Sequence, residues 1–319
     1  MNIVWFKRDL RILDHEPLCR ACEAGQFLPL YIIEPSLWKQ PDVSYRHYHY
    51  LQHYLEQLDT MFKTRGSKLV VKVGEALTVF KSLAENHNIK SIYSHYETWT
   101  KFSRDRDQSI RQWVEKNSID WKEYQQNGVV RNLNSRDGWS TLWHGHMRKK
   151  IYEIPEKIFC ISEDSDNLPS CQDMQLEFDG FEPNTNFSKI EPGIVLKSFL
   201  TERGENYQRE MSGPLLSADS CSRLSTHIAF GTISIRTIFQ RTQAQTRKSL
   251  DLVGDNIKNW RASYNSFQKR LRWHCHFIQK LEDLRSIEWK NIHPIYDKLE
   301  RETAYSENFE KWKRGETGF

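Results

Sequence analysis

The stretch NIVWFKRDLRILDHEPLCRACEAGQFLPLYII, residues 2–33, has the pattern of a single strand–helix–strand unit. Its two ends, Asn2–Phe6 and Phe27–Ile33, are apolar runs with the length of buried strands. The residues between them, from about Asp14 to Ala24, predict a helix that Gly25 ends. Two apolar strands joined by a helix predict a parallel pair buried on both faces.

The same alternation continues through the first part of the chain. Further strands are predicted at 68–73, 91–97 and 120–125, and further helices at about 44–63, 75–86 and 103–116. Short apolar strands that alternate with helices are typical of a doubly wound parallel α/β sheet.

The composition and the pattern of the sequence change after the last of these strands. Residues 155–192 are rich in proline and acidic side chains and show no periodicity, so we expect a long interdomain connection. After Gly193 only helices are predicted, at 195–203, 223–230, 234–247, 257–282 and 306–313. The expected division is an α/β domain over 1–130, a linker over 131–192 and an all-helical domain over 193–319.

Composition excludes several classes of protein. Hydrophobic residues make up 38% of the 319 residues and charged residues 28%, as in soluble globular proteins. No apolar run has the length of a membrane span, and the first residues do not resemble a signal peptide. We therefore predict a cytoplasmic protein without membrane contact, and we expect a monomer.

The cysteines and histidines do not predict a metal site. The six cysteines are expected to be reduced thiols, and Cys19 and Cys22 form a lone C-x-x-C pair without a second pair of ligands. His47, His49 and His53 share one helix but have no carboxylate partner in the pattern. We interpret both groups as structural.

The segment Cys221–Arg236, CSRLSTHIAFGTISIR, can be interpreted in two ways. Good N-cap residues precede a short apolar helix that Gly231 ends, which by itself describes an ordinary capped helix. The free amides of a helix start, the hydroxyls of Ser222 and Ser225 and the guanidinium of Arg223 also make a cradle for an anion.

The predicted helix 257–282 carries two stripes of side chains. The first stripe is mainly apolar and consists of Trp260, Tyr264, Phe267, Leu271, His274, Ile278 and Leu281. The second stripe combines a charged residue with aromatic rings and consists of Ser266, Arg270, Trp273 and Phe277. The first stripe is typical of a core, but it also fits a buried aromatic ligand. Residues 221–280 contain 11 Lys and Arg against 2 Asp and Glu, which indicates either a solvated basic face or a phosphate-binding surface.

Four stretches in this order resemble the photolyase/cryptochrome family of flavoproteins. They are VWFKRDLRILDHEPL (4–18), HYETW (95–99), CSRLSTHIAFGTIS (221–234) and KWKRGETGF (311–319). The resemblance implies an α/β domain that can bind an antenna chromophore of the folate or deazaflavin type, followed by a helical domain that binds FAD.

The resemblance also implies roles for individual residues. FAD would contact a set in the helical part, consisting of Tyr207, Cys221, Ser222, Arg223, Leu224, Ser225, Phe267, Arg270 and His274. Damaged DNA would face Arg270, Trp273, His274 and Phe277, and the antenna would contact Glu97. No catalytic side chain is assigned within the chain. The family motif continues past Phe319, so the resemblance predicts a truncated chain that lacks the remaining flavin contacts and the tryptophans of electron transfer.

Several positions depart from the family pattern. Lys7, His15, Cys221 and Thr226 replace arginine, asparagine, threonine and proline. Arg270 stands where many dimer-repairing members have a glutamate, and His274 where they have an arginine.

Three functions remain open at this point. The first is light-driven repair of cyclobutane pyrimidine dimers in DNA, by electron transfer from reduced FAD. The second is a cryptochrome-type photoreceptor that binds FAD without repair, which the charge reversal at Arg270 favours. The third is a nucleotide-binding α/β protein without photochemistry, although the chain lacks a G-x-G-x-x-G fingerprint.

Overall fold

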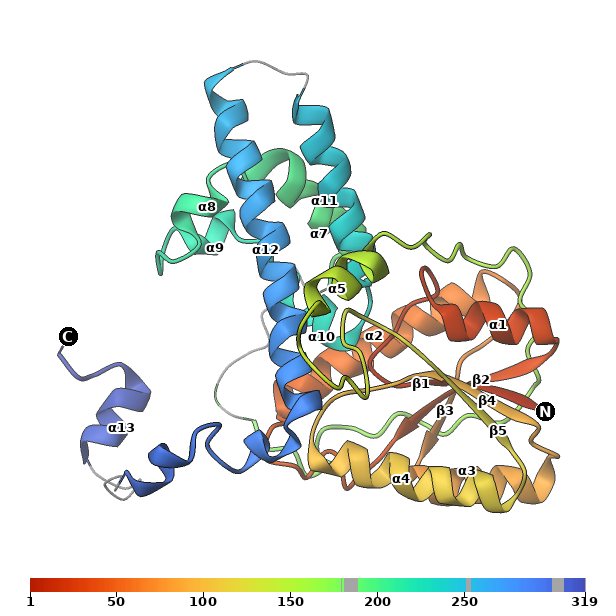
Figure 1. Ribbon diagram of the computed structural model, residues 1–319. Helices are drawn as coiled ribbons and strands as arrows, with labels where there is room; N and C mark the ends of the chain where they lie inside the picture. The colour runs from red at the N-terminus through yellow and green to blue at the C-terminus, as the bar shows by residue number, and fades with distance from the viewer. Residues whose placement is uncertain (179, 181–188, 251–253, 300–306, 319) are drawn as a thin grey trace.

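The computed structural model describes residues 1–178, 180, 189–250, 254–299 and 307–318. Its first part is a five-stranded parallel sheet with the strand order β3-β2-β1-β4-β5 (Figure 1). The strands are β1 (Asn2–Phe6), β2 (Phe27–Ile33), β3 (Val70–Val73), β4 (Ser91–His95) and β5 (Asp120–Tyr124). The predicted doubly wound sheet is confirmed, and the first two strands have the predicted bounds.

Helices cover both faces of the sheet. They are α1 (Glu16–Ala24) and α2 (Tyr45–Lys63) on one face, and α3 (Ala76–Asn86) and α4 (Lys101–Lys116) on the other (Figure 1). Successive strand residues alternate between the two cores: Phe6 packs with Phe62 of α2, and Trp5 packs with Phe80 of α3. Because β1 and β4 are neighbours whose crossovers leave in opposite directions, the crevice at their carboxyl ends is the switch point where such sheets bind ligands.

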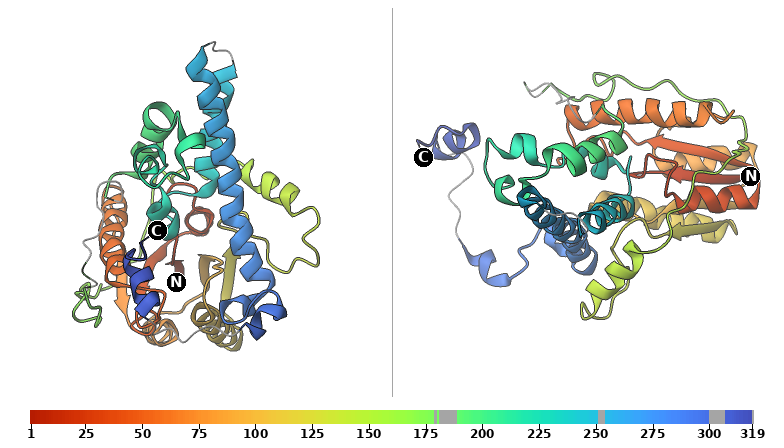
Figure 2. Two further views of the ribbon diagram at one scale, coloured as in Figure 1. Left: turned by 90° about the vertical axis from the view of Figure 1, so that its left-hand side faces the viewer. Right: turned by 90° about the horizontal axis from the view of Figure 1, so that it is seen from above.

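The second part of the chain is helical, as predicted. It contains α7 (Pro192–Ser198), which continues as a π-helix η1 (Phe199–Arg203), then α8 (Tyr207–Glu210), α9 (Ser217–Ser220), α10 (Ser225–Phe230), α11 (Ile235–Leu250), α12 (Asp255–Asp283), two 3₁₀ segments η2 (Arg285–Glu288) and η3 (Pro294–Lys298), and α13 (Glu307–Arg314). Helices α11 and α12 pack side by side and project away from the sheet, and α13 lies apart from the rest (Figures 1 and 2). None of the helices in the described residues is both long and apolar enough to cross a membrane.

Two features lie within residues 131–192, the predicted linker. Helix α5 (Trp139–Met147) packs on α11, where Trp143 meets Phe239 edge-on with ring centroids 5.1 Å apart. Further along, the chain follows the edge of the sheet, since Ile161 N–H donates to the Phe27 carbonyl and Asp166 N–H to that of Val71. This segment covers hydrogen-bonding groups that an edge strand leaves exposed. The domain boundaries themselves stay a prediction.

A buried polar interface joins the helical part to the loop after β1. Leu10 N–H donates to the Phe230 carbonyl at 3.1 Å, and the guanidinium of Arg11 donates to the Gly231 carbonyl at 2.9 Å. Arg236 of α11 pairs with the Asp14 carboxylate, with its Nε 3.1 and 3.0 Å from the two oxygens. Burial raises the pKa of Asp14, but its hydrogen bonds with Arg236 and the nearby Arg11 charge outweigh burial and leave this pKa below its ordinary value.

His146 of α5 lowers the stability of the folded protein. It is buried, and neither of its ring nitrogens has a hydrogen-bond partner among the described residues. Burial, with Arg236 and Lys149 nearby, lowers the pKa of His146 from 6.5 to about 3. The folded protein therefore holds a neutral imidazole without partners, and the unfolded chain binds an extra proton below pH 6.5.

We predict that His146→Leu stabilises the protein and makes it less sensitive to acid. Stability falls as the pH drops from 6.5 towards 3, and at pH 5 the histidine costs about 2 kcal/mol. Urea unfolding of both proteins at pH 7 and pH 5 should show the larger gain at pH 5. An equal gain at both values would mean that His146 is solvated in the folded state.

Candidate functional sites

One arginine, Arg203, fixes the conformation of the loop that leads into α10. The guanidinium of Arg203 donates to the carbonyl oxygens of Cys221 and Ser222, the latter at 2.7 Å. Arg223 has a left-handed φ of 60°, and its Nε donates to the Ala218 carbonyl at 2.7 Å. These bonds satisfy two carbonyl groups of the loop and tie Arg223 to α9.

The amides and hydroxyls of this loop suit an anion. The backbone N–H groups of Ser222 and Leu224, and the hydroxyls of Ser222 and Ser225, make no hydrogen bond within the described residues. Two guanidinium groups, of Arg203 and Arg223, lie beside them. Unpaired donors next to positive charge fit the diphosphate of a dinucleotide, so the predicted cradle is compatible with FAD.

Two of the other residues predicted to contact FAD pack against each other behind this loop. Phe267 of α12 and Tyr207 of α8 meet edge-on at 5.8 Å, and each also contacts Phe199. Both rings are buried. The pair shares a core cluster with Leu224 of the loop, so it can form a floor beside the loop. Burial raises the pKa of Tyr207 to about 12, so its phenol is neutral.

Helix α12 separates the remaining predicted residues onto two sides. Trp273 and Phe277 are 50% and 56% exposed, and the Arg270 guanidinium lies 4.9 Å from the Trp273 ring centre. His274 instead lines a cavity of about 80 Å³ between the two parts of the molecule, together with Arg8. Burial and the Arg8 charge lower the pKa of His274 to about 4, so it is neutral at physiological pH.

A second pocket lies at the carboxyl ends of β1, β2 and β4. It has a volume of about 160 Å³, and its walls include Glu97 and the aromatic rings of Trp5, Phe6, Tyr31, Trp38, Trp99 and Phe230. Arg106 links Glu34 at 3.0 Å and Glu97 at 2.9 Å, which orients both carboxylates. Within the described residues the other Glu97 oxygen and the Trp38 indole N–H have no partner, so one acceptor and one donor remain for a ligand.

Sequence reasoning identified Glu97 in this pocket and missed Arg106, Glu34 and Trp38. Glu34 could have been found, because it is a charged residue directly after the apolar strand β2. Arg106 lies in the middle of α4, where an arginine usually faces solvent, and nothing in the local pattern indicates its burial.

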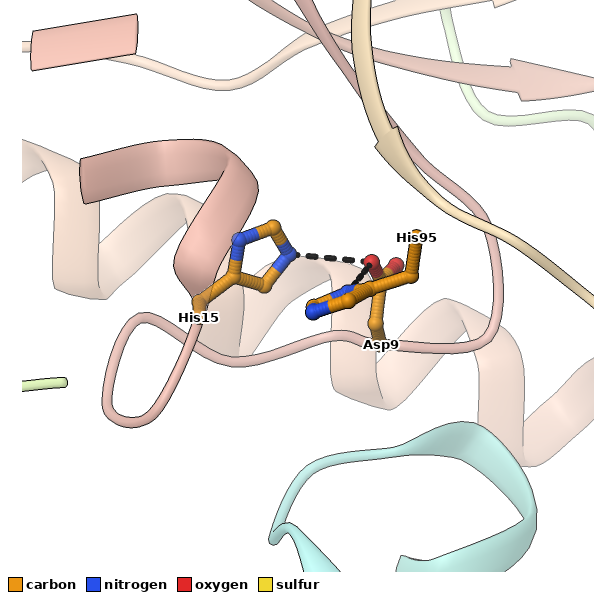
Figure 3. Close-up of side chains that lie close together, drawn as sticks. All are labelled: Asp9, His15 and His95. Atoms are coloured by element: carbon orange, nitrogen blue, oxygen red, sulfur yellow. Dashed lines mark hydrogen bonds and ion pairs between the residues drawn. The ribbon is translucent and has the colours of Figure 1, made fainter. Parts of the chain in front are cut away.

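Asp9, His15 and His95 form a buried cluster at the switch point (Figure 3). His15 and His95 both donate to the same oxygen of Asp9, at 3.0 and 2.6 Å. The other nitrogen of His15 accepts the Leu18 N–H at 3.1 Å, which places the His15 proton on the nitrogen that faces Asp9. Sequence analysis did not predict this cluster, because its members are far apart along the chain.

Although three ligand atoms of this cluster lie within 4.8 Å of one another, their hydrogen bonds argue against a metal ion. A metal needs the lone pair that the His15 proton occupies. Burial lowers the pKa of His95 to about 3, so both imidazoles stay neutral donors. Burial alone would raise the pKa of Asp9, but the two imidazoles lower it well below the usual range. The cluster thus ties the β1 loop, the start of α1 and the end of β4 together.

Comparison with known proteins agrees with this architecture. Residues 2–136 match the family model for DNA photolyase, and residues 267–319 match that for the FAD binding domain of DNA photolyase. The deoxyribodipyrimidine photo-lyase of Salmonella typhimurium is 21% identical, over all of this chain and 68% of its own length. Cryptochrome DASH of Synechocystis sp. is 24% identical, over 99% of this chain and 67% of its own.

Solved structures show the same fold. A bacterial class III photolyase from Agrobacterium tumefaciens superposes with a TM-score of 0.78 at 20% identity, over 98% of this chain and 65% of that protein. The chain therefore spans about two thirds of the length of its relatives. Its helical part carries the family's FAD-binding domain, and FAD is the cofactor of that domain. With a photolyase model matching at each end and the same fold throughout, the chain belongs to the photolyase/cryptochrome family of flavoproteins.

Proposed function

We propose that this protein uses light and bound FAD to repair cyclobutane pyrimidine dimers in DNA. The observation that supports this most is the exposed stripe of Arg270, Trp273 and Phe277 on α12. Exposed aromatic rings beside an arginine suit a base that has left the duplex, because they offer a stacking surface next to a phosphate contact.

The residues that would hold FAD are the loop from Cys221 to Ser225 and the floor formed by Tyr207 and Phe267. When bound and reduced, FAD supplies a light-activated electron for opening the dimer. Arg203 positions the loop, and the loop amides and Arg223 bind the diphosphate. Trp273 packs against the extruded base, and Arg270 beside it binds a flanking phosphate.

The pocket at the carboxyl ends of β1, β2 and β4 is proposed as the antenna site. Its aromatic walls suit a flat conjugated ring, and Glu97 and Trp38 supply an acceptor and a donor. The free Glu97 oxygen and the Trp38 indole N–H are both buried. A ligand that forms hydrogen bonds with them therefore removes the cost of leaving these groups unpaired.

A cryptochrome-type photoreceptor is the second candidate, and Arg270 favours it. Its guanidinium cannot accept a hydrogen bond, whereas a carboxylate at this position accepts one. A photoreceptor would bind FAD in the same loop and respond to light without changing DNA.

The test mixes the reduced, FAD-loaded protein with dimer-containing DNA under blue light. Light-dependent return of thymine absorbance, absent in a dark control, is expected for repair. FAD-loaded protein that leaves the dimers intact would sink the proposal and favour the photoreceptor, and Arg270→Glu would then be tested for gain of repair.

FAD binding has its own prediction. Arg203→Ala should raise the dissociation constant for FAD about 10- to 100-fold, because losing a hydrogen-bonded charge that orders a loop costs about 1.5–3 kcal/mol. Arg209→Ala is the matched control, since the Arg209 side chain bonds only to the nearby Asn206 within the described residues. Titration by flavin fluorescence measures both; equal constants would contradict the role of Arg203.

A further inference from the structure

A separate groove shares no lining residue with the loop from Cys221 to Ser225 or with the antenna pocket. It has a volume of about 880 Å³ and lies between α11, the first half of α12 and the chain that follows α5. Most of the residues that line this groove, here called the α11 groove, are of polar types; they are Leu13, Arg148, Ile151, Glu153, Thr237, Gln240, Arg241, Gln243, Ala244, Thr246, Arg247, Asn265 and Gln268.

Three arginines of the α11 groove are exposed. Within the described residues, the guanidinium groups of Arg148, Arg241 and Arg247 make no ion pair and no hydrogen bond. Glu153 is the only acidic residue in the described walls, so the groove carries a net positive charge. Arg236, one residue along the same helix from Thr237, is by contrast fully paired with Asp14.

The spacing of these arginines indicates a ligand with several anionic groups. Arg241 and Arg247 are six residues apart on α11, a rise of about 9 Å along the helix. Guanidinium groups spread along this distance fit a chain of phosphates, which passes each of them in turn. Guanidinium groups bind phosphate through two parallel hydrogen bonds, which suits an extended phosphodiester backbone.

The lining also favours a nucleic-acid backbone over a protein partner. Protein interfaces depend on anchors that are enriched in aromatic residues, whereas the described walls contain no aromatic residue and only Leu13 and Ile151 as large apolar ones. Backbone binding depends instead on charge and on polar groups. Gln243 and Asn265 offer amides that have no hydrogen bond within the described residues.

The α11 groove is distinct from the surface assigned to damaged DNA. On α12, Gln268 faces the groove, while Arg270 lies two residues further, about 200° around the helix. A duplex held by Arg270 and Trp273 therefore meets the opposite side of this helix.

We propose that the α11 groove is a second nucleic-acid site, which binds the phosphate backbone without regard to sequence or damage. It would hold a separate segment of nucleic acid and keep the protein on DNA while the other face searches for lesions. The affinity comes from release of counterions, so it falls steeply with salt.

The test uses the triple variant Arg148→Gln, Arg241→Gln, Arg247→Gln and an undamaged duplex oligonucleotide in the dark. The slope of log affinity against log salt should become shallower by about 0.9 for each lost contact, and affinity at low salt should fall at least about tenfold. The control is Lys39→Gln, Lys68→Gln, Lys81→Gln, which removes the same charge from exposed positions of the α/β part.

Two outcomes would overturn the proposal. An equal loss in the control variant would mean that only net charge matters. If the triple variant loses binding of tripolyphosphate but keeps its affinity for the duplex, the groove is a small-anion site instead. Circular dichroism checks that the variants fold, and each single Arg→Gln variant should give about a third of the change in slope.

The result is independent of the proposed repair activity, because no light or damage is involved. Arg270→Gln should leave the contribution of the α11 groove unchanged, so its effect on affinity should add to that of the triple variant. If the protein fails to repair dimers but its affinity for undamaged duplex depends on salt as expected here, only the proposed repair function is rejected.

Discussion

Replacing Arg236 by methionine is expected to destabilise the protein by about 3–5 kcal/mol. The substitution leaves the buried Asp14 carboxylate without its hydrogen-bonded arginine, and breaking a buried pair from one side carries a penalty of this size. Arg236 and Asp14 side chains are 5% and 1% exposed, so water cannot replace the lost partner. Urea unfolding followed by circular dichroism measures the change.

A double variant separates the buried charge from the packing. Asp14→Asn combined with Arg236→Met removes both charges, and asparagine tolerates the left-handed φ of 53° at this position. We expect the double variant to be more stable than Arg236→Met alone, because the unpaired carboxylate is gone, while the buried Arg11 keeps its hydrogen bonds to the carbonyl oxygens of Asp14 and Gly231 and the nearby Asp9 charge. The exposed Arg20→Met, whose partners are Glu16 and Glu23, is the control and should cost less than about 1 kcal/mol.

An outcome in which Arg236→Met and Arg20→Met cost the same would contradict a buried ion pair between the two parts. A double variant less stable than Arg236→Met would show that the remaining hydrogen bonds of Asp14, with Ser234 and Tyr152, matter more than its charge.

Gly231→Ala is the second change with a large expected effect. Gly231 has a φ of +69°, and a Cβ there would lie 2.1 Å from the Arg8 carbonyl oxygen and 2.6 Å from the Asp9 Cα. Both atoms are backbone, so the clash can be relieved only by separating α10 from the β1 loop. The left-handed conformation costs about 1–2 kcal/mol, and overpacking adds about 1–3 kcal/mol.

Gly66→Ala isolates the contact between the two parts. Gly66 also follows a helix and has a φ of +72°, but nothing lies within 4 Å of its Cβ position. Both variants carry the same backbone strain, so the difference between their free energies of unfolding measures the clash. Equal losses at Gly66 and Gly231 would show that the parts can separate at this loop without cost.

The sequence alone was sufficient for the fold class. The apolar runs of β1 and β2 have the predicted bounds because they are buried on both faces, and such strands show in a single sequence as continuous apolar residues. The long helices α2 and α12 were predicted for a related reason, since each keeps one apolar stripe against a core. Helix α5 was missed, because aromatic and histidine residues dominate it and no clear stripe results.

The loop from Cys221 to Ser225 was also identified from local sequence. Its hydroxyls, its arginine and the helix that follows are neighbours along the chain, so a short window contains the whole arrangement. What the window could not supply is Arg203, which reaches the loop from 18 residues upstream and holds its carbonyl groups.

Only the tertiary structure decided which charges come together. The cluster of Asp9, His15 and His95 joins two strand ends separated by 86 residues, and Arg236 finds Asp14 across 222 residues. Local propensity and periodicity depend on neighbours within a few residues, whereas pairing of buried charges depends on chain topology and on exclusion of water. For this reason the chain's sequence was sufficient to predict its layers and to single out the loop from Cys221 to Ser225, whereas the packing of the two parts determined the pocket at the carboxyl ends of β1, β2 and β4, the polar interface and the α11 groove.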